Sequence, residues 1–360
     1  MDEGAGDIES EAFLNKIDDV GMTYDFKTSR DAFTGGLKTL KSNSGDAFNL
    51  MAMMLNQPRF DAEPFGRMKA SLTSRLRRQQ TDPRAIASNA MRETVFPNHP
   101  YGNPPRGTLE EFPKLSIDDV RGYRNRVFAK DNLIVGVVGA ISADELKPVL
   151  DQLFAGLSEK AELIEVPDLV VETGKDIHVE FNVPQTNIMF TLPGLKREDP
   201  DFYAAYLVNH ILGGGSFSSR LYEEVREKRG LAYGAYSYLG TFDKSGIIGA
   251  GSATGAERAQ QTIDIIRNEI ERMAEEGPAP EEFEKAKLYI KGSYAINNLD
   301  TSDKIASVLV AIQEAKLGID YIEKRGEYID GVTLEDAKRV AKKYLSAKPT
   351  LVTVGQKLTQ

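Results

Sequence analysis

Residues 213–238 read GGGSFSSRLYEEVREKRGLAYGAYSY, and this stretch decides the local fold in the second half of the chain. Three glycines open it, and a charged segment that ends at Arg229 follows them. The charged segment predicts a short helix, which Gly230 ends because glycine is favoured just past a helix terminus. The tyrosines after Gly230 favour a β-strand. We therefore expect Arg226 and Tyr233 to lie on either side of a helix-to-strand junction.

Two interpretations of Arg226 and Tyr233 are open. Cations near the carbonyl end of a helix complement its dipole, so the arginine needs no further role there. Strand alternation, however, predicts that Tyr233, Ala235 and Ser237 share one face, where the small residues leave room for a ligand chain. A guanidinium and a phenol can both donate hydrogen bonds to a peptide carbonyl or an oxyanion. This chemistry favours a substrate-binding role for the pair.

The glycines before this helix predict a second part of the same site. The loop consists of Gly213, Gly214, Gly215 and Ser216. Its backbone amides could bind an anion, but the GxxxxGK[ST] pattern of a nucleotide site is missing. A tight connection that lets a peptide backbone approach is the simpler role. We therefore add this loop, together with Phe217, to the candidate substrate-binding residues.

The histidines do not predict a metal site. His99, His178 and His210 each stand alone, and none has a histidine or glutamate partner four residues away. The motif His-x-x-Glu-His is missing from the sequence. We therefore expect no metal ion and no cofactor in this chain, and three structural histidines.

A diverged internal repeat organises the chain. Residues 115–139 and 332–355 both begin with a capping box, continue as an amphipathic helix and end in a β-rich run followed by glycine. The two final glycines are 216 residues apart, and a second matching pair, at Phe65 and Phe283, is 218 residues apart. Two matches at nearly one offset indicate a duplicated domain.

The offset leaves residues 176–215 without a counterpart in the first half. That segment holds two strand-like runs, 177–181 and 187–192, and a helical pattern over 199–212. The first domain is therefore expected to be N-terminally incomplete. Either the chain is truncated at its start or another chain supplies the missing strands and helix.

The repeat predicts an α+β protein with two similar domains, each a mostly antiparallel sheet with helices packed on it. We place the domains at residues 1–157 and 176–360, with a linker over 158–175, where periodicity is lost. The apolar run Leu133–Val138 is expected to be a buried strand of the first domain.

Composition excludes several classes of function. The chain has 360 residues, enough for two ordinary domains with separate cores. Its net charge of −9 does not favour a nucleic-acid partner. No apolar run is long enough to span a bilayer, and the acidic start predicts no signal peptide. The absence of cysteine excludes disulfides, thiolate zinc sites and cysteine nucleophiles.

Residues 213–238 resemble the C-terminal half-site of the pitrilysin/insulinase class of zinc peptidases, the M16 family. In that family an Arg/Tyr pair at this spacing holds the substrate opposite a zinc ion that a His-x-x-Glu-His motif of another domain binds. The opening DEGAGD is similar to non-catalytic subunits of the bacterial heterodimeric branch. The helix expected over Pro64–Gln80 corresponds to the one that carries the glutamate zinc ligand in active members, and it contains no glutamate.

The resemblance implies the two-domain clamshell of the M16/LuxS-like metallohydrolase fold and a non-catalytic subunit of a two-chain peptidase. A partner subunit with His-x-x-Glu-His would hold the zinc ion, and this chain would close the chamber and position peptide through Arg226 and Tyr233. Peptidase activity is then expected of the pair and not of this chain alone. The alternative is a structural or peptide-binding clamshell protein with no role in proteolysis. The compartment stays open between bacterial periplasm and cytoplasm, with the periplasm favoured if truncation removed a signal peptide.

Overall fold

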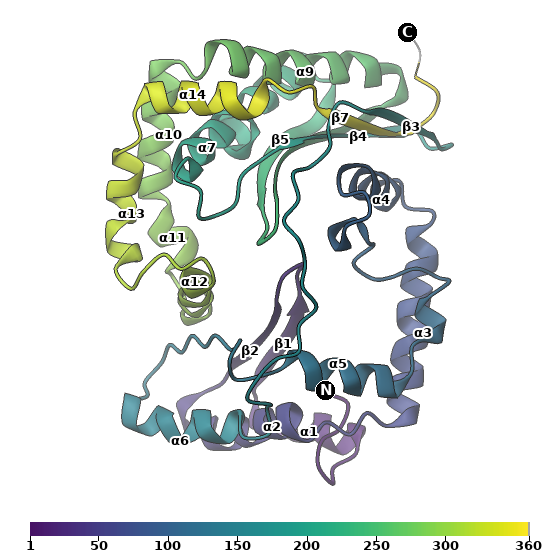
Figure 1. Ribbon diagram of the computed structural model, residues 1–360, viewed down its shortest axis with the longest axis vertical. Helices are drawn as coiled ribbons and strands as arrows, with labels where there is room; N and C mark the ends of the chain where they lie inside the picture. Colours follow the sequence, from purple (N-terminus) through teal and green to yellow (C-terminus); the bar gives the residue numbers. More distant parts are fainter. Residues whose placement is uncertain (359–360) are drawn as a thin grey trace. The chain divides into compact units, whose positions relative to one another are not determined.

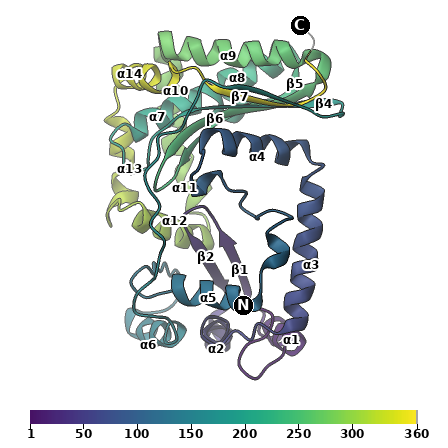
Figure 2. The ribbon, with the colours of Figure 1, turned by 45° about the vertical axis from the view of Figure 1, so that its right-hand side comes forward.

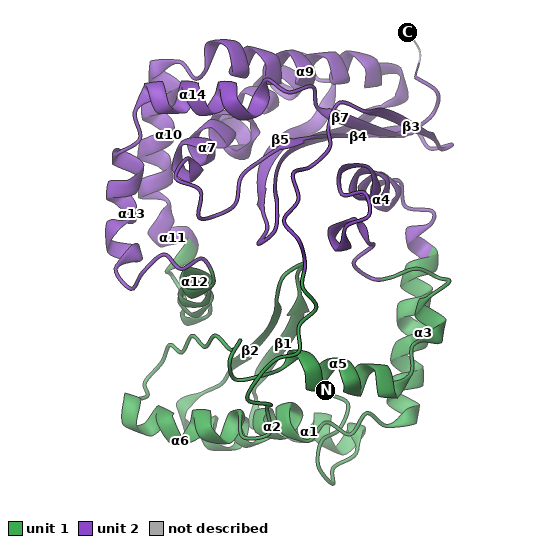
Figure 3. Cartoon of the chain, viewed as in Figure 1, with its two compact units in different colours: residues 1–77, 107–165, 298–314 green, residues 78–106, 166–297, 315–360 purple. Residues whose placement is uncertain are grey.

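The computed structural model describes residues 1–358, which form two compact units (Figure 3). Both units are discontinuous in sequence. Unit 1 contains residues 1–77, 107–165 and 298–314, and unit 2 contains residues 78–106, 166–297 and those from 315 onward. The predicted division into domains at residues 1–157 and 176–360 stays a prediction. Each of the two units instead gathers segments from separate parts of the chain. No helix among the described residues is long and apolar enough to cross a membrane.

Unit 2 is built on a five-stranded sheet with the strand order β3-β7-β4-β6-β5 (Figure 1). Strands β3 and β7 pair in parallel, and every other neighbouring pair is antiparallel. The strands are β3 (Asp176–Glu180), β4 (Gln185–Pro193), β5 (Ala232–Thr241), β6 (Gly246–Gly255) and β7 (Thr350–Gly355). Strand β5 therefore forms one edge of the sheet. The predicted α+β class with a mostly antiparallel sheet is confirmed.

Helices cover both faces of this sheet, as Figure 2 shows. On β4, Ile188 and Phe190 are buried with α7, α9 and α14, whereas Met189 packs in a second core with α4. Successive strand residues point to opposite faces, so a strand covered on both sides needs a continuous apolar run, which β4 has. The helices of unit 2 are α4 (Pro83–Val95), α7 (Phe202–Asn209), α8 (Arg220–Tyr222), α9 (Ala259–Glu276), α10 (Pro280–Gly292), most of α11 (Tyr294–Asn298), α13 (Tyr321–Asp330) and α14 (Leu334–Leu345).

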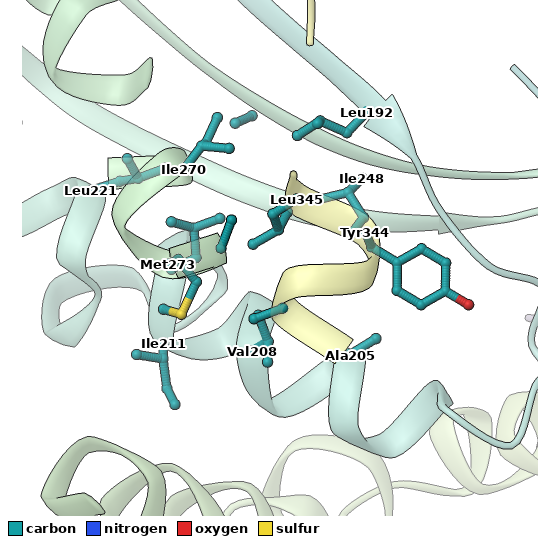
Figure 4. Packing of buried hydrophobic residues seen from close by; sticks show 14 of the residues in the cluster. Leu192, Ala205, Val208, Ile211, Leu221, Ile248, Ile270, Met273, Tyr344 and Leu345 are labelled. Carbon is teal, nitrogen blue, oxygen red and sulfur yellow. The ribbon is translucent and has the colours of Figure 1, made fainter. Parts of the chain in front are cut away.

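The larger core of unit 2 lies between the sheet and α7, α9 and α14, and Figure 4 shows part of it. Ile248 comes from β6, Val208 from α7, Ile270 from α9 and Leu345 from α14. Burying one such side chain contributes about 1.5–3 kcal/mol to stability. This core holds the end of α7, from which the glycine loop starts.

Unit 1 has a smaller core. Phe13 and Ile17 of α1 pack with Leu50 and Met54 of α2 and with Leu153 of α6. Its two strands, β1 (Thr23–Thr28) and β2 (Phe33–Lys38), form an antiparallel pair. Its helices are α1 (Ser10–Val20), α2 (Ser44–Asn56), most of α3 (Ala62–Gln79), α5 (Ile117–Val127), α6 (Ala143–Leu153) and α12 (Ser302–Glu314).

The strand predicted at Leu133–Val138 is not present. The segment has no regular structure, and Leu133, Ile134 and Val137 are exposed. A strand needs hydrogen-bonded neighbours, and within residues 1–358 strands β1 and β2 pair only with each other. The segment packs instead along α12, where a Cβ on Gly136 would lie 2.8 Å from the carbonyl oxygen of Ala306.

Most other predicted elements form. The two strand-like runs after residue 176 are β3 and β4, and the helix expected over 199–212 is α7 with its extension. The capping boxes at Ser116 and Thr333 both close, each with the aspartate three residues later. The helix parts of the repeat therefore form in both halves, whereas the strand part forms only in the second. Superposition of the two halves stays a prediction.

Candidate functional site

The glycine loop is shaped by close contact with strand β5. Helix α7 continues as a π-helical turn, η4 (His210–Gly214), which lies against Ser237. A Cβ on Gly213 would collide with the backbone nitrogen of Ser237, and one on Gly215 would lie 2.8 Å from the carbonyl oxygen of His210. The Ser237 hydroxyl donates to the side-chain oxygen of Asn209 at 2.8 Å. Side chains at these two glycine positions would push the loop away from the strand.

The loop exposes Phe217. Ser216 adopts φ 50°, in the left-handed region that non-glycine residues rarely occupy. The hydroxyl of Ser219 donates to the carbonyl oxygen of Ser216 at 2.8 Å, and that of Ser218 donates to Gly215 at 3.1 Å. Phe217 is 75% exposed, and its ring meets the ring of Tyr222 edge-on, with centroids 4.9 Å apart.

A buried arginine anchors the short helix that follows. Arg220 lies at the start of α8 and forms a two-pronged ion pair with Glu282 of α10, with N···O distances of 2.8 and 2.6 Å. It also donates to the carbonyl oxygen of Gly277 at 3.1 Å. Bidentate pairs of this kind fix orientation as well as distance. Arg220 therefore holds α8, and the π-helical turn η6 (Glu223–Glu227) after it, against α10.

The three cations near the helix end have different partners. Glu224 accepts from Lys228 at 2.7 Å and from Arg229, and these hydrogen bonds, that of Lys228 first, hold the pKa of the Glu224 carboxyl below its usual value. The ion pair of Arg226, with Glu227, is longer at 3.9 Å. A role at the helix terminus therefore accounts for Lys228 and Arg229 better than for Arg226.

Arg226 lies against two tyrosine rings. Its guanidinium carbon is 4.5 Å from the ring centroid of Tyr233 and 4.9 Å from that of Tyr222. Tyr233 is 86% exposed. Contacts of this kind are cation–π interactions. The predicted pair is therefore brought together on the surface of unit 2, where a guanidinium and a phenol can reach one ligand.

The predicted face of Tyr233 is wrong. Ala235 and Ser237 are buried, and the turn η4 covers Ser237, so their face is not open to a ligand. Pairing of β5 with β6 shifts register between Ala232 and Ala235, which breaks the alternation and leaves Tyr233 exposed. The sequence carries one sign of this irregularity, since a glycine inside a strand, here Gly234, often marks a bulge.

Tyr222 is a site residue that the sequence analysis missed. Its ring lies between Phe217 and Arg226 and contacts both. Burial raises the pKa of its phenol. The nearby guanidinium of Arg226 acts in the opposite direction and lowers that pKa, but burial has the larger effect. The spacing could have revealed it, because residues four apart on a helix share a face.

The His, Cys, Asp and Glu side chains of the described residues do not form a zinc site. Among residues 1–358 no three His, Cys, Asp or Glu side chains come together as a metal site. His99 accepts from the backbone of Tyr101, His178 contacts Thr353, and His210 stacks on Tyr289 with ring centroids 5.3 Å apart. Burial lowers the pKa of His210.

A surface hollow of about 390 Å³ lies elsewhere in unit 2, and it contains no candidate site residue. It lies beside the start of α4 and the β3–β4 turn. Its lining residues are Asp82, Pro83, Arg84, Val183, Pro184, Gln185 and Asn187.

Comparison with known proteins finds similarity to the M16 peptidase family. Residues 114–289 match the family model of the peptidase M16 inactive domain. The structure is similar to a crystal structure of a peptidase M16 inactive domain from Pseudomonas fluorescens, with a TM-score of 0.94, 26% identity, and coverage of 100% of this chain and 87% of that chain. The fold is thus shared over the whole length of this chain, and both matches support a relationship to the M16 peptidase family.

Two curated relatives carry different descriptions. An uncharacterized zinc protease YmxG of Bacillus subtilis is 25% identical, covering 84% of this chain and 74% of its own length. A protein of Helicobacter pylori described as a non-peptidase homolog YmxG is 23% identical, covering 85% of this chain and 71% of its own. The relatives therefore include one described as a protease and one described as lacking that activity.

Proposed function

We propose that this chain is the non-catalytic subunit of a two-chain M16 zinc peptidase and that it holds peptide substrate through Arg226 and Tyr233. The observation that carries the proposal is the position of Arg226. Its neighbours Lys228 and Arg229 bind Glu224, whereas Arg226 packs against the exposed ring of Tyr233. A surface that presents two hydrogen-bond donors side by side suits a peptide carbonyl.

The chemistry divides between two chains. The zinc ion, the activated water and the general base would belong to a partner subunit with His-x-x-Glu-His, because no three metal-binding side chains come together within residues 1–358 of this chain. This chain would close the chamber and orient the peptide. Donors that act on a carbonyl where charge develops strengthen in the transition state, so the pair would affect turnover as well as binding.

The test is a reconstituted pair. Arg226→Ala and Tyr233→Phe are each expected to lower kcat/KM by about 10-fold to 1000-fold, the range for losing such a donor. Assembly, followed by light scattering after gel filtration, is expected to be unchanged. Tyr236→Phe is the matched control, because that tyrosine stacks on Tyr238 instead of meeting Arg226.

Three results would overturn the proposal. Equal activity of all three variants would show that Arg226 and Tyr233 have only a structural role. Loss of assembly in the arginine variant would make Arg226 an interface residue. If the protein binds peptide but has no zinc-bearing partner and takes part in no proteolysis, the alternative is favoured, a peptide-binding protein with no role in proteolysis.

A further inference from the structure

A cluster of one arginine and three aromatic rings in unit 2 shares no residue with the candidate site described above. Its members are Arg197, which follows β4, Phe202 and Tyr203 at the start of α7, and Tyr321 at the start of α13, and we call them the Arg197 cluster. The guanidinium carbon of Arg197 lies 3.8 Å from the ring centroid of Phe202, in cation–π contact. The ring centroids of Tyr203 and Tyr321 lie 5.4 and 5.7 Å from the same carbon. These contacts fix the position of the cation.

The Arg197 cluster has more hydrogen-bond donors than acceptors. The oxygen of Tyr321 accepts from the Tyr203 hydroxyl at 2.9 Å and from Nη2 of Arg197 at 3.1 Å. Two hydroxyls that bond to each other use one hydrogen, and within residues 1–358 the second hydrogen has no acceptor. Nε and Nη1 of Arg197 have no acceptor in the same part of the chain. Because Tyr321 is only 7% exposed, an unused donor there is costly unless a ligand or water accepts from it.

The charge of Arg197 also lacks a counterion. Among the residues that the structure describes, Arg197 forms no ion pair. The two aspartates close to it in sequence have other partners. Asp199 accepts from the Tyr344 hydroxyl at 3.3 Å, and Asp201 accepts from Arg339 at 2.8 Å. Arg197 is partly exposed, so an anion from solution can reach it.

A second arginine strengthens the positive field. Arg325 lies four residues after Tyr321 on α13, is 7% exposed, and donates to the carbonyl oxygen of Ile290 at 3.3 Å. Its guanidinium carbon lies 3.9 Å from the ring centroid of Tyr294. Burial raises the pKa of the Tyr294 phenol, whereas Arg325 and Arg197 both act to lower it, so the two cations lie near one ring. No ion pair neutralises Arg325 in the described part of the chain, and an anion beside Arg197 would interact favourably with both charges.

We propose that the Arg197 cluster binds a carboxylate of a peptide through Arg197 and the tyrosine hydroxyls. A carboxylate is an acceptor-only group with two oxygens, and it can therefore take the donors that the protein leaves unused. Its single negative charge matches the one partly exposed cation better than a phosphate dianion would, because Arg325 is buried. A peptide C-terminus and an acidic side chain present this same chemistry. The cluster and the candidate site have no residue in common, so the inference does not depend on the proposed function.

Peptide binding to the purified full-length chain, measured by isothermal titration calorimetry, tests the inference. The probes are three acetylated tripeptides: alanine-alanine-phenylalanine with a free C-terminal carboxylate, the same sequence as an amide, and an amide with glutamate in the central position. At least one of the two acidic peptides is expected to bind wild-type protein at least about tenfold more tightly than the uncharged amide, as for a charge-assisted hydrogen bond. The acidic peptide that binds shows which source of the carboxylate the site takes. This preference is expected to fall below about twofold in Arg197→Gln and below about fivefold in Tyr321→Phe.

Arg267→Gln is the matched control, because it removes the same charge from a partly exposed position of unit 2, on α9, where Arg267 pairs with Asp176 at 3.9 Å. It should keep the preference, and an equal loss there would reduce the effect to net charge and overturn the inference. The inference is also wrong if wild-type protein prefers neither acidic peptide or if Arg197→Gln keeps the preference. Displacement of the bound peptide by an equal concentration of inorganic phosphate would overturn the assignment of a carboxylate. If Arg197→Gln lowers the thermal unfolding temperature, Tyr321→Phe, which removes one hydroxyl, decides the question.

Discussion

At the scale of single residues, two glycines of unit 2 differ in the space that their surroundings leave for a side chain. A Cβ on Gly213 would collide with the backbone of Ser237, whereas one on Gly234 would meet no atom within 4 Å. Gly213→Ala is therefore expected to lower the free energy of unfolding by about 1–3 kcal/mol, as overpacking does. Gly234→Ala should stay within about 0.5 kcal/mol of wild type. Urea unfolding of both variants measures the difference, and equal stability would show that the loop moves without cost.

The same scale separates what the sequence could predict from what it could not. Gly230 ends the helix with φ 59°, as its position predicted, because a helix stop depends on the backbone of one residue. The pairing of Arg226 with Tyr233 followed from the resemblance. The exposure of Phe217 could not be predicted, because an aromatic residue is buried or exposed according to contacts that are distant in sequence.

At the scale of elements, a carboxylate joins the start of α7 to α14. Asp201 accepts from Arg339 at 2.8 and 3.2 Å and from Lys343 at 2.8 Å. These hydrogen bonds, that of Arg339 first, lower the pKa of Asp201 to about 2. A depressed carboxyl pKa contributes stability above the unfolded value of about 3.9, and that contribution is lost as pH falls towards 2.

Asp201→Asn tests this link. At pH 7 the variant is expected to be less stable by up to about 2 kcal/mol, and the gap should narrow steadily between pH 4 and pH 2. Asp300→Asn is the control, since the ion pair of Asp300 with Lys304 is exposed and contributes little. Urea unfolding at several pH values measures both. A gap that does not change with pH would mean that packing, and not charge, accounts for the loss.

At this scale, local sequence patterns predict some structural features correctly and others wrongly. The capping boxes at Ser116 and Thr333 form because each involves atoms only three residues apart. Leu133–Val138 has the composition of a buried strand, but a strand exists only when another strand pairs with it. Tyr233 lies at a register shift that depends on how β5 meets β6. The two predictions that failed, the strand at Leu133–Val138 and the face of Tyr233, both depended on how strands pair, whereas the capping boxes depended only on atoms within one helix.

At the scale of the whole molecule, we expect the purified chain to hold no stoichiometric zinc and to hydrolyse no peptide. Helix α3 carries Arg75, Arg77 and Arg78 where the resemblance places a glutamate ligand in active members. The only glutamate of α3, Glu63, lies in its first turn and pairs with Arg67 at 2.8 Å. Elemental analysis after dialysis measures the metal. About one tightly held zinc per chain, together with chelator-sensitive proteolysis, would contradict the prediction.

The position of β7 within its sheet has a consequence for how the protein is made. This strand contains residues 350–355, yet it lies between β3 and β4, which the ribosome completes long before. Until β7 emerges, β3 has no partner strand, and the apolar side of α4 lacks Val352 and Val354 of its core. Unit 2 therefore cannot finish folding during synthesis of its first strands. Nascent chains that stall before residue 350 should expose apolar surface and depend on chaperones until translation resumes.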